Sequence, residues 1–256
     1  MRPDPYAWSP LADEAVVLVP ALLLAYAVAA RAERTDRRRV VLFAAGAALI
    51  VVVFVTPLQA LSLHYLLTAH LLQNVALAEW APALCIAGLP PVAAARLARL
   101  PEIRLLTRPI VALPVWVATY LIWHIPVIYD AALEHPAWLL HLEHLSYLVA
   151  GGLLWWPVFQ DVPHRMSSGA KAIYLFLAFV LASPLGLLLG LLPQVVYDFY
   201  GRAPRIWGLS HIGDQQLAGI TMVSEQALVF FAVSVAFLTR HLREEEAREQ
   251  FRSFVS

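Results

Sequence analysis

The sequence predicts an all-α polytopic membrane protein, a bundle of seven transmembrane helices, and three observations predict it. Hydrophobic residues make up 61% of the 256 residues and charged residues only 14%, whereas soluble domains carry about a quarter charged residues. Several apolar runs reach the length of about 20 residues that a helix needs to cross a bilayer. Polar or proline-rich breaks separate these runs, so residues 1–256 are expected to form a single transmembrane domain.

Seven apolar segments follow one another along the chain. The first follows an acidic, proline-rich stretch without a cleavage pattern of small residues, so we expect a retained helix and not a removed signal peptide. The charged residues 241–256 after the last segment are expected to form a solvated cytoplasmic tail. The predicted helices are residues 12–31, 40–61, 63–89, 109–130, 137–158, 169–192 and 214–240.

The basic residues predict the orientation of the bundle. Fifteen of the eighteen lysines and arginines follow the first, third, fifth or seventh segment. Because basic loops stay in the cytoplasm, the N-terminus is predicted outside and the C-terminus inside the cell. Residues 91–106 alternate small apolar residues with arginines, so this stretch is expected along the inner interface.

Histidines gather near the outer ends of the predicted helices, where seven of the nine fall. An imidazole in hydrocarbon is costly and usually has a functional role. His141 and His144 are neighbours at i,i+3 that could hold one ion from one helix face, while Glu143 is expected to point elsewhere. The candidate metal ligands are His64, His70, His124, His141 and His144.

Five further polar residues accompany these histidines. Asn74 follows His70 by four residues and shares its helix face. Asp130 and Asp214 are expected to orient imidazoles or complete the shell of a metal site. Glu79 and Glu225 lie deep in predicted helices, where they could be neutral and hydrogen bonded or relay protons.

The ligand types narrow the choice of metal. Imidazole and carboxylate suit Cu(II), zinc, iron or nickel, and thiol and thioether ligands for Cu(I) are nearly absent, with Cys85 the only cysteine. A lone cysteine also excludes an internal disulfide. The sequence contains no phosphate-binding loop, nucleophile motif or basic groove for nucleic acid, so the bilayer is the partner that the composition implies.

Four stretches in order along the chain carry a family resemblance: AHLLQNVALAEWAPALCIAGLPP (69–91), WHIPVIYDAAL (123–133), HLEHLSYLVAGGLLWWPV (141–158) and WGLSHIGDQQLAGITM (207–222). They resemble the bacterial integral-membrane cytochrome c oxidase assembly factors of the CtaG type, associated with caa-type oxidases. The resemblance covers roughly residues 60–242. It implies a seven-helix protein of the bacterial plasma membrane that supports maturation of a haem–copper oxidase through copper supply. The implied partners are oxidase subunits or a copper chaperone, and no catalytic turnover is expected.

By resemblance, the family's histidines correspond to His70, His124, His141 and His144, and its aspartate to Asp214. One position departs from the family pattern, which commonly has a second histidine four residues after the first in the third helix. Here that position is Asn74, a poor ligand for copper. His64 would then supply the missing imidazole, or the metal would bind weakly, or metal binding would not be the role of this branch.

Other functions stay open at this point. A haem-binding or redox membrane protein would use histidines as axial ligands. A proton-coupled transporter would use Glu79 and Glu225 with the outer histidines as a relay. A scaffold that docks oxidase subunits needs no metal. Zinc, iron or haem therefore remain alternatives to copper.

Overall fold

The structure, a computed structural model, describes residues 4–9, 14–31 and 35–255. Its regular elements within these residues are all helical, with no strand, which confirms the all-α prediction. Four π-helical turns adjoin the α-helices: η1 (Glu14–Leu18), η2 (Ala76–Trp80), η3 (Pro136–Leu140) and η4 (Ala227–Phe231). The α-helices are α1 (Val19–Arg31), α2 (Arg37–Val55), α3 (Pro57–His64), α4 (Leu67–Val75), α5 (Ala81–Gly88), α6 (Pro91–Leu97), α7 (Pro101–Leu106), α8 (Pro109–Trp123), α9 (Pro126–Glu134), α10 (His141–Phe159), α11 (Ser168–Leu191), α12 (Asp198–Arg202), α13 (His211–Gln226) and α14 (Ala232–Val255).

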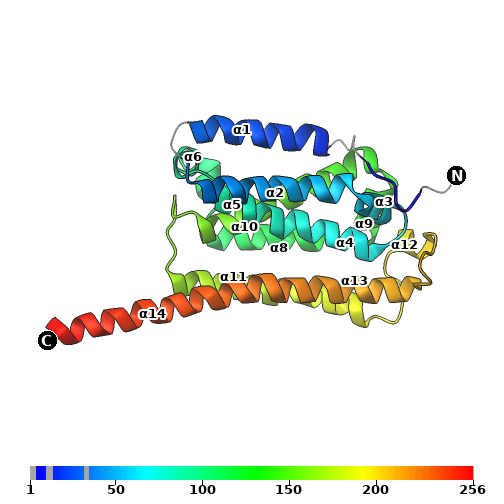
Figure 1. Ribbon diagram of the computed structural model, residues 1–256. Coiled ribbons are helices and arrows are strands. Elements are labelled where there is room, and N and C mark those ends of the chain that lie inside the picture. The colour runs from blue at the N-terminus through cyan, green and yellow to red at the C-terminus, as the bar shows by residue number, and fades with distance from the viewer. Residues whose placement is uncertain (1–3, 10–13, 32–34, 256) are drawn as a thin grey trace.

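The long helices lie side by side in one bundle (Figure 1). Helix α1 runs along one edge, and α11 and α13 run along the opposite edge (Figure 1). Between them α2 packs on α5, and α10 packs on both α5 and α8. Helices α13 and α14 continue through η4 as one helix that leaves the bundle at the end opposite α12 (Figure 1). The residues predicted as a charged tail lie in this projecting helix as far as the structure describes them.

Four helices are long and apolar enough to cross a membrane, and they lie in Arg37–Val55, Leu67–Gly88, Ser168–Leu191 and His211–Phe254. A fifth is counted if α8 and α9, which are bent by 71° at their junction, form one span. The first predicted crossing corresponds to a shorter apolar helix, Ala15–Arg31. The chain is therefore a multi-pass membrane protein, and the predicted number of seven crossings stays a prediction, as does the orientation.

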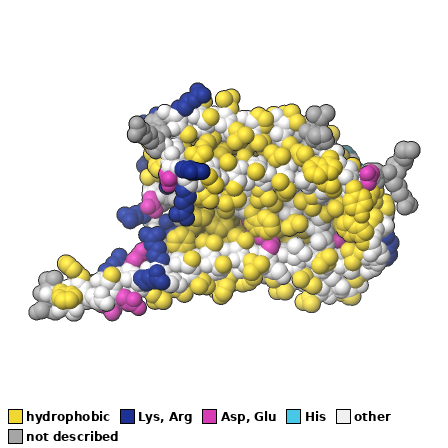
Figure 2. Space-filling model, viewed as in Figure 1, with side chains coloured by type: hydrophobic (Ala, Val, Ile, Leu, Met, Phe, Trp, Pro, Cys, Tyr) yellow, Lys and Arg dark blue, Asp and Glu magenta, His cyan; other side chains and the backbone are white. Residues whose placement is uncertain are grey.

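The surface of the bundle suits a lipid environment. Large side chains such as those of Ile110, Leu191 and Leu228 are 81%, 78% and 72% exposed. Figure 2 shows hydrophobic side chains along the visible flank of the bundle, with lysines and arginines gathered at the end where α14 leaves it. The gathering of basic residues at that end agrees with the charge asymmetry read from the sequence, while Arg202 of α12 lies at the other end. The short helices α6 and α7 form the arginine-rich stretch that was expected along an interface.

Close packing of α11 on α13 depends on small residues. A Cβ atom on Gly219 would collide with the backbone of Gly186 and Gly190 across the interface. Small residues let membrane helices approach until their backbones touch, which strengthens van der Waals contact where the hydrophobic effect is weak. Gly219 therefore holds α13, and the polar residues on it, against the rest of the bundle.

The predicted helix over residues 40–61 is broken. Helix α2 ends at Val55, and Thr56 adopts an extended conformation before Pro57 opens α3. Proline disfavours a helical conformation in the residue before it and has no N–H to donate to the carbonyl four residues earlier. That carbonyl, of Val53, accepts a hydrogen bond from Gln73 Nε2 at 3.0 Å. The break thus ties α2 to α4.

The predicted helix over residues 109–130 is broken as well. Helix α8 stops at Trp123, and α9 starts at Pro126 after an extended Ile125. The same proline effect explains the break. His124 therefore sits at the C-terminal cap of α8 and not in mid-helix.

A third proline lies beside the π-helical turn η2. Pro82 has no N–H for the carbonyl of Ala78, which accepts a hydrogen bond from Trp116 Nε1 at 3.2 Å. Trp116 is buried, and it comes from α8. The Trp116 side chain of α8 thus satisfies a carbonyl of the neighbouring turn η2, next to Glu79.

Candidate functional site

Three of the five candidate ligands lie in the interior of the bundle. His70 on α4, His124 at the end of α8 and His144 on α10 are 1%, 5% and 1% exposed. His124 and His144 are both close enough to act electrostatically on His70. The rings of His70 and His124 flank Tyr129, with centroid distances of 5.1 and 5.8 Å. Three separate helices therefore direct imidazoles to one region.

The hydrogen bonds of His70 identify its tautomer. Its Nδ1 lies 2.8 Å from the Tyr200 hydroxyl, which donates its own proton to the Ser62 carbonyl at 2.5 Å. A hydroxyl has one proton to give, so His70 Nδ1 must be the donor to Tyr200. The neutral ring then carries its lone pair on Nε2. That buried atom has no hydrogen-bond partner among the described residues and lies 3.8 Å from Glu143 Oε1.

His124 is held in the same tautomer by a different partner. Its Nδ1 lies 2.7 Å from the carbonyl oxygen of Tyr120, which can only accept, so Nδ1 carries the proton. The Nε2 lone pair is again buried without a hydrogen-bond partner in the described part of the chain. Tyr197 donates to the His124 carbonyl at 3.2 Å and steadies the break after α8.

Glu143 belongs to this site, although the sequence reading expected it to point elsewhere. It is 1% exposed, and its Oε1 accepts from Asn74 Nδ2 at 2.9 Å as well as facing His70. Helical spacing places Glu143 on a different face of α10 from His141 and His144. On that face Glu143 meets α4, which supplies Asn74 and His70 as its partners. The feature of the sequence that could have identified Glu143 as a site residue is its position as an acidic residue at the start of an otherwise apolar helix.

Asp214 caps the helix that carries His70. Its carboxylate accepts from the backbone N–H of Leu67 at 2.7 Å and of Thr68 at 3.1 Å, and from the Thr68 hydroxyl at 2.7 Å. These are the first amides of α4, which have no partner within the helix. Asp214 thus sets the position of His70 through α4.

Asp130 plays the matching part for Tyr200. Its two carboxylate oxygens accept from the backbone N–H of Asp198 and of Phe199, each at 3.1 Å, at the start of α12. Tyr200 lies on that short helix. The carboxylates of Asp214 and Asp130 therefore position the two ends of the His70–Tyr200 hydrogen bond.

A second buried polar group lies around Glu79 and Glu225. Glu79 is fully buried and Glu225 is 7% exposed. The two carboxyl groups lie close enough to act electrostatically on each other, and one buried oxygen of each, Glu79 Oε2 and Glu225 Oε1, has no hydrogen-bond partner among the described residues. Gln226 Nε2 donates to Glu79 Oε1 at 3.2 Å and to the Tyr120 hydroxyl at 2.9 Å, and Trp80 Nε1 donates to Glu225 at 2.5 Å.

This second group connects to the histidines through one residue. Tyr120 bonds Gln226 with its hydroxyl and His124 with its backbone carbonyl. The π-helical turn η2 contains Glu79, and η4 begins two residues after Glu225. Such turns widen a helix locally and often mark functional positions.

The other two candidate ligands lie away from the interior. His64, at the end of α3, is exposed, and His141, one turn before His144, is half-buried. Among the described residues, no three His, Cys, Asp or Glu side chains are arranged closely enough to hold a metal ion. The imidazoles of His70, His124 and His144 are thus buried, and the rings of His70 and His124 carry their proton on Nδ1, but the geometry is not that of a closed metal site.

Comparison with known proteins identifies the family. No curated protein and no solved structure matches the chain. A family model described as cytochrome c oxidase caa3 assembly factor (Caa3_CtaG) matches residues 22–244 and so covers α2 to α13 completely. The chain belongs to the cytochrome c oxidase caa3 assembly factor family.

Proposed function

We propose that this protein assists assembly of a haem–copper oxidase by binding copper at His70, His124 and His144 and passing it on, without catalytic turnover. The observation that carries the proposal is the pair of buried Nε2 lone pairs on His70 and His124. A histidine that ligates a metal usually donates its other ring N–H to a carbonyl, carboxylate or similar group, which orients the ring. Tyr200 and the Tyr120 carbonyl play that part for these two imidazoles.

Copper enters this proposal as cargo. The described geometry is open, so capture requires the three imidazoles to move toward one another. Glu143 beside His70 would, once ionised, offset the charge of the ion. The half-buried His141 and the exposed His64 would provide an access route from the surface. A site that stays open without cargo suits a protein that must release its metal.

The proposed setting is the bacterial plasma membrane with the histidines toward the outer face. The lysines and arginines gather at the opposite end of the bundle (Figure 2), where the positive-inside rule places the cytoplasm. Oxidase subunits or a copper chaperone would then meet the protein at the outer end. Asn74, where the family has a histidine, binds Glu143 and so contributes to the charge environment and not to the ligand set.

Elemental analysis and copper titration of detergent-purified protein test the proposal. The variant His70→Ala, His144→Ala is compared with the wild type and with a control, His164→Ala, His241→Ala, which removes two histidines elsewhere. We expect near-stoichiometric copper in the wild type and the control, and loss of copper in the first variant. Wild-type protein that takes up no copper would refute copper binding, and an absorption band of haem would favour a redox protein.

The hydrogen bond to Tyr200 provides a sharper test. Tyr200→Phe keeps the ring and removes the acceptor of the His70 Nδ1 proton. Loss of such an orienting group typically weakens metal affinity by about 10- to 100-fold. Tyr174→Phe, which removes a buried hydroxyl bonded only to the backbone carbonyl of Leu154, is the matched control. Equal copper affinity in both variants would contradict the assigned tautomer.

A second function, proton exchange, is favoured by the carboxyl pair Glu79 and Glu225. The closeness of the two carboxyl groups and the hydrogen bonds from Glu79 through Gln226 and Tyr120 toward His124 would let the pair respond to a charge arriving at the histidines. Infrared difference spectroscopy on copper addition tests this role. We expect a change in the protonated-carboxyl band that disappears in Glu79→Gln, Glu225→Gln. A change that persists in this variant would assign the signal to another group.

A further inference from the structure

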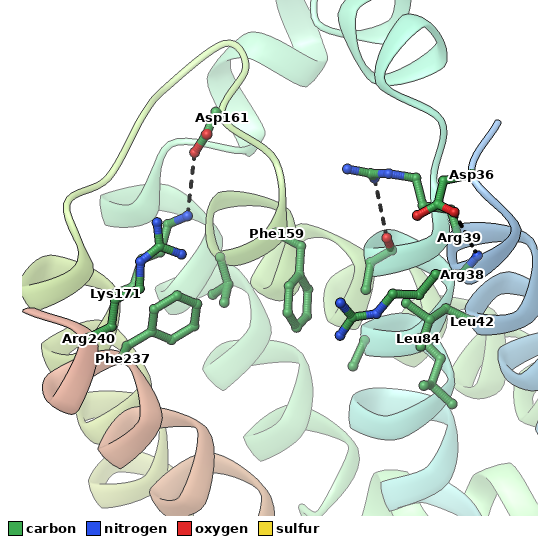
Figure 3. Close-up of a pocket in the computed structure, with 13 residues that line it drawn as sticks. Asp36, Arg38, Arg39, Leu42, Leu84, Phe159, Asp161, Lys171, Phe237 and Arg240 are labelled. Atoms are coloured by element: carbon green, nitrogen blue, oxygen red, sulfur yellow. Dashed lines mark hydrogen bonds and ion pairs between the residues drawn. The ribbon is translucent and has the colours of Figure 1, made fainter. Parts of the chain in front are cut away.

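A large cavity lies at the end of the bundle where the basic residues gather. Its volume is about 630 Å³, and helices α2, α5, α10, α11 and α14 supply its walls. Figure 3 shows arginines of α2 on one side and the basic side chains of α11 and α14 on the other. The cavity is lined by Asp36, Arg38, Arg39, Lys171 and Arg240 together with apolar side chains and Asp161.

The cations of the cavity are not all neutralised by its two carboxylates. Lys171 Nζ lies 3.4 Å from Asp161. Asp36 accepts from the backbone N–H of Arg38, as the cap of α2. The Arg38 guanidinium points into the cavity (Figure 3), and no described carboxylate lies within ion-pair distance of it. The lining therefore carries a net positive charge.

The rest of the lining is apolar. Leu42, Leu84, Phe159 and Phe237 form the walls between the two groups of cations. Lys171 lies over the Phe237 ring at 5.5 Å, so charged and apolar surfaces are adjacent. A small hydrophilic anion would use the cations but leave these walls in contact with water. A molecule that joins an anionic group to an apolar part matches both surfaces.

A neighbouring cavity of about 440 Å³ shares Lys171 and Arg240 and extends the basic surface along α14. It adds Arg165 and Arg248 and one carboxylate, Glu244. Glu244 already accepts from Arg240 Nε at 2.9 Å. The positive surface thus reaches from the end of the hydrophobic flank to the projecting part of α14, which is the level of lipid headgroups in a membrane.

We propose that this cavity binds the headgroup of an anionic phospholipid. The phosphate would be bound between the Arg38 side and the Lys171 and Arg240 side, and the first carbons of the acyl chains would contact Phe159 and Phe237. Basic pockets between membrane helices at the inner interface are suited to such headgroups. The proposal is independent of copper binding, because it uses the opposite end of the bundle.

Native mass spectrometry of the full-length protein tests the proposal. The wild type is exchanged into mixtures of phosphatidylglycerol and phosphatidylcholine, with and without excess inorganic phosphate. We expect retained phosphatidylglycerol that phosphate does not displace. Equal retention of the two lipids would overturn the proposal, and displacement by phosphate would assign the cavity to free anions. This comparison of lipids requires the wild-type protein only.

Variants then locate the lipid. Arg38→Gln, Arg240→Gln removes two cations from the cavity, and Arg243→Gln, Arg252→Gln removes the same charge from α14 outside both cavities. Each cation near an anionic lipid contributes about a fivefold change in affinity, so the first variant should bind roughly 30-fold more weakly. The control should be unchanged. An equal loss in both variants would show general charge attraction and no site.

Discussion

Replacement of Asp214 by alanine tests the central structural assignment, that this carboxylate anchors α4. In the structure Asp214 is 5% exposed and accepts three hydrogen bonds from Leu67 and Thr68. Alanine leaves the buried N–H of Leu67, the partly buried N–H of Thr68 and the Thr68 hydroxyl without that acceptor. Because α4 carries His70, the change should both lower stability and disturb the histidine site.

The magnitude follows from the number and kind of bonds. A hydrogen bond to a charged group contributes about 1.5–3 kcal/mol, and two of these bonds involve amides that the helix itself cannot satisfy. We therefore expect a loss of about 3–5 kcal/mol for Asp214→Ala. Asp214→Asn retains one acceptor oxygen and should lose about half as much. For a chain of this size, about 2–4 °C of melting temperature corresponds to 1 kcal/mol.

Thermal unfolding in one detergent, followed by tryptophan fluorescence, measures the effect. The control is Ser210→Ala, which removes a cap of α13 that accepts a single hydrogen bond, from Gly213 N–H at 2.9 Å. Such a cap contributes about 1 kcal/mol. The melting temperature should fall by roughly 10 °C for Asp214→Ala and by a few degrees for the control. Equal shifts in the two variants would refute the anchoring role.

Three further substitutions probe other parts of the structure. Gly219→Ala should lower the melting temperature by several degrees, because the new Cβ meets backbone across the α11–α13 interface, whereas Gly152→Ala has room and should be neutral. Trp116→Phe should lower stability by about 1–3 kcal/mol, through the lost bond to the Ala78 carbonyl and the space left behind, as measured by thermal unfolding. Arg39→Gln should lower it by about 1–2 kcal/mol in the same assay, because the Arg39 guanidinium donates to carbonyls at the end of α5.

The overall class of the fold was readable from the sequence, and the breaks in its helices were not. Long apolar runs predict helices that cross a membrane, and the structure is helical throughout its described residues. Mean hydropathy hardly changes when an apolar run contains a proline, so the runs that contain Pro57 and Pro126 were each predicted as one continuous helix. The local rule for proline contained the missing information.

The candidate site was readable in part. His70, His124 and His144 are buried, as their depth in apolar segments suggested, whereas His64 is exposed. Tyr200, Glu143 and the caps formed by Asp130 and Asp214 depend on contacts between distant segments. Tyr200 lies 130 residues after its partner His70. Helical spacing relates residues within one helix only, so it could not identify these partners.

The hydrogen bonds that replace those lost at prolines also bear on how the sequence can change over time. Pro57 and Gln73 act as a unit, since the amide of Gln73 serves the carbonyl that the proline leaves unbonded. Pro82 and Trp116 act likewise. If a related sequence replaces the proline, the backbone N–H of the new residue can bond the carbonyl, and the side-chain donor is no longer needed. If the related sequence replaces only the donor, the carbonyl is left without a partner in the apolar interior of the membrane. The two positions of a unit should therefore be inherited, and replaced, together.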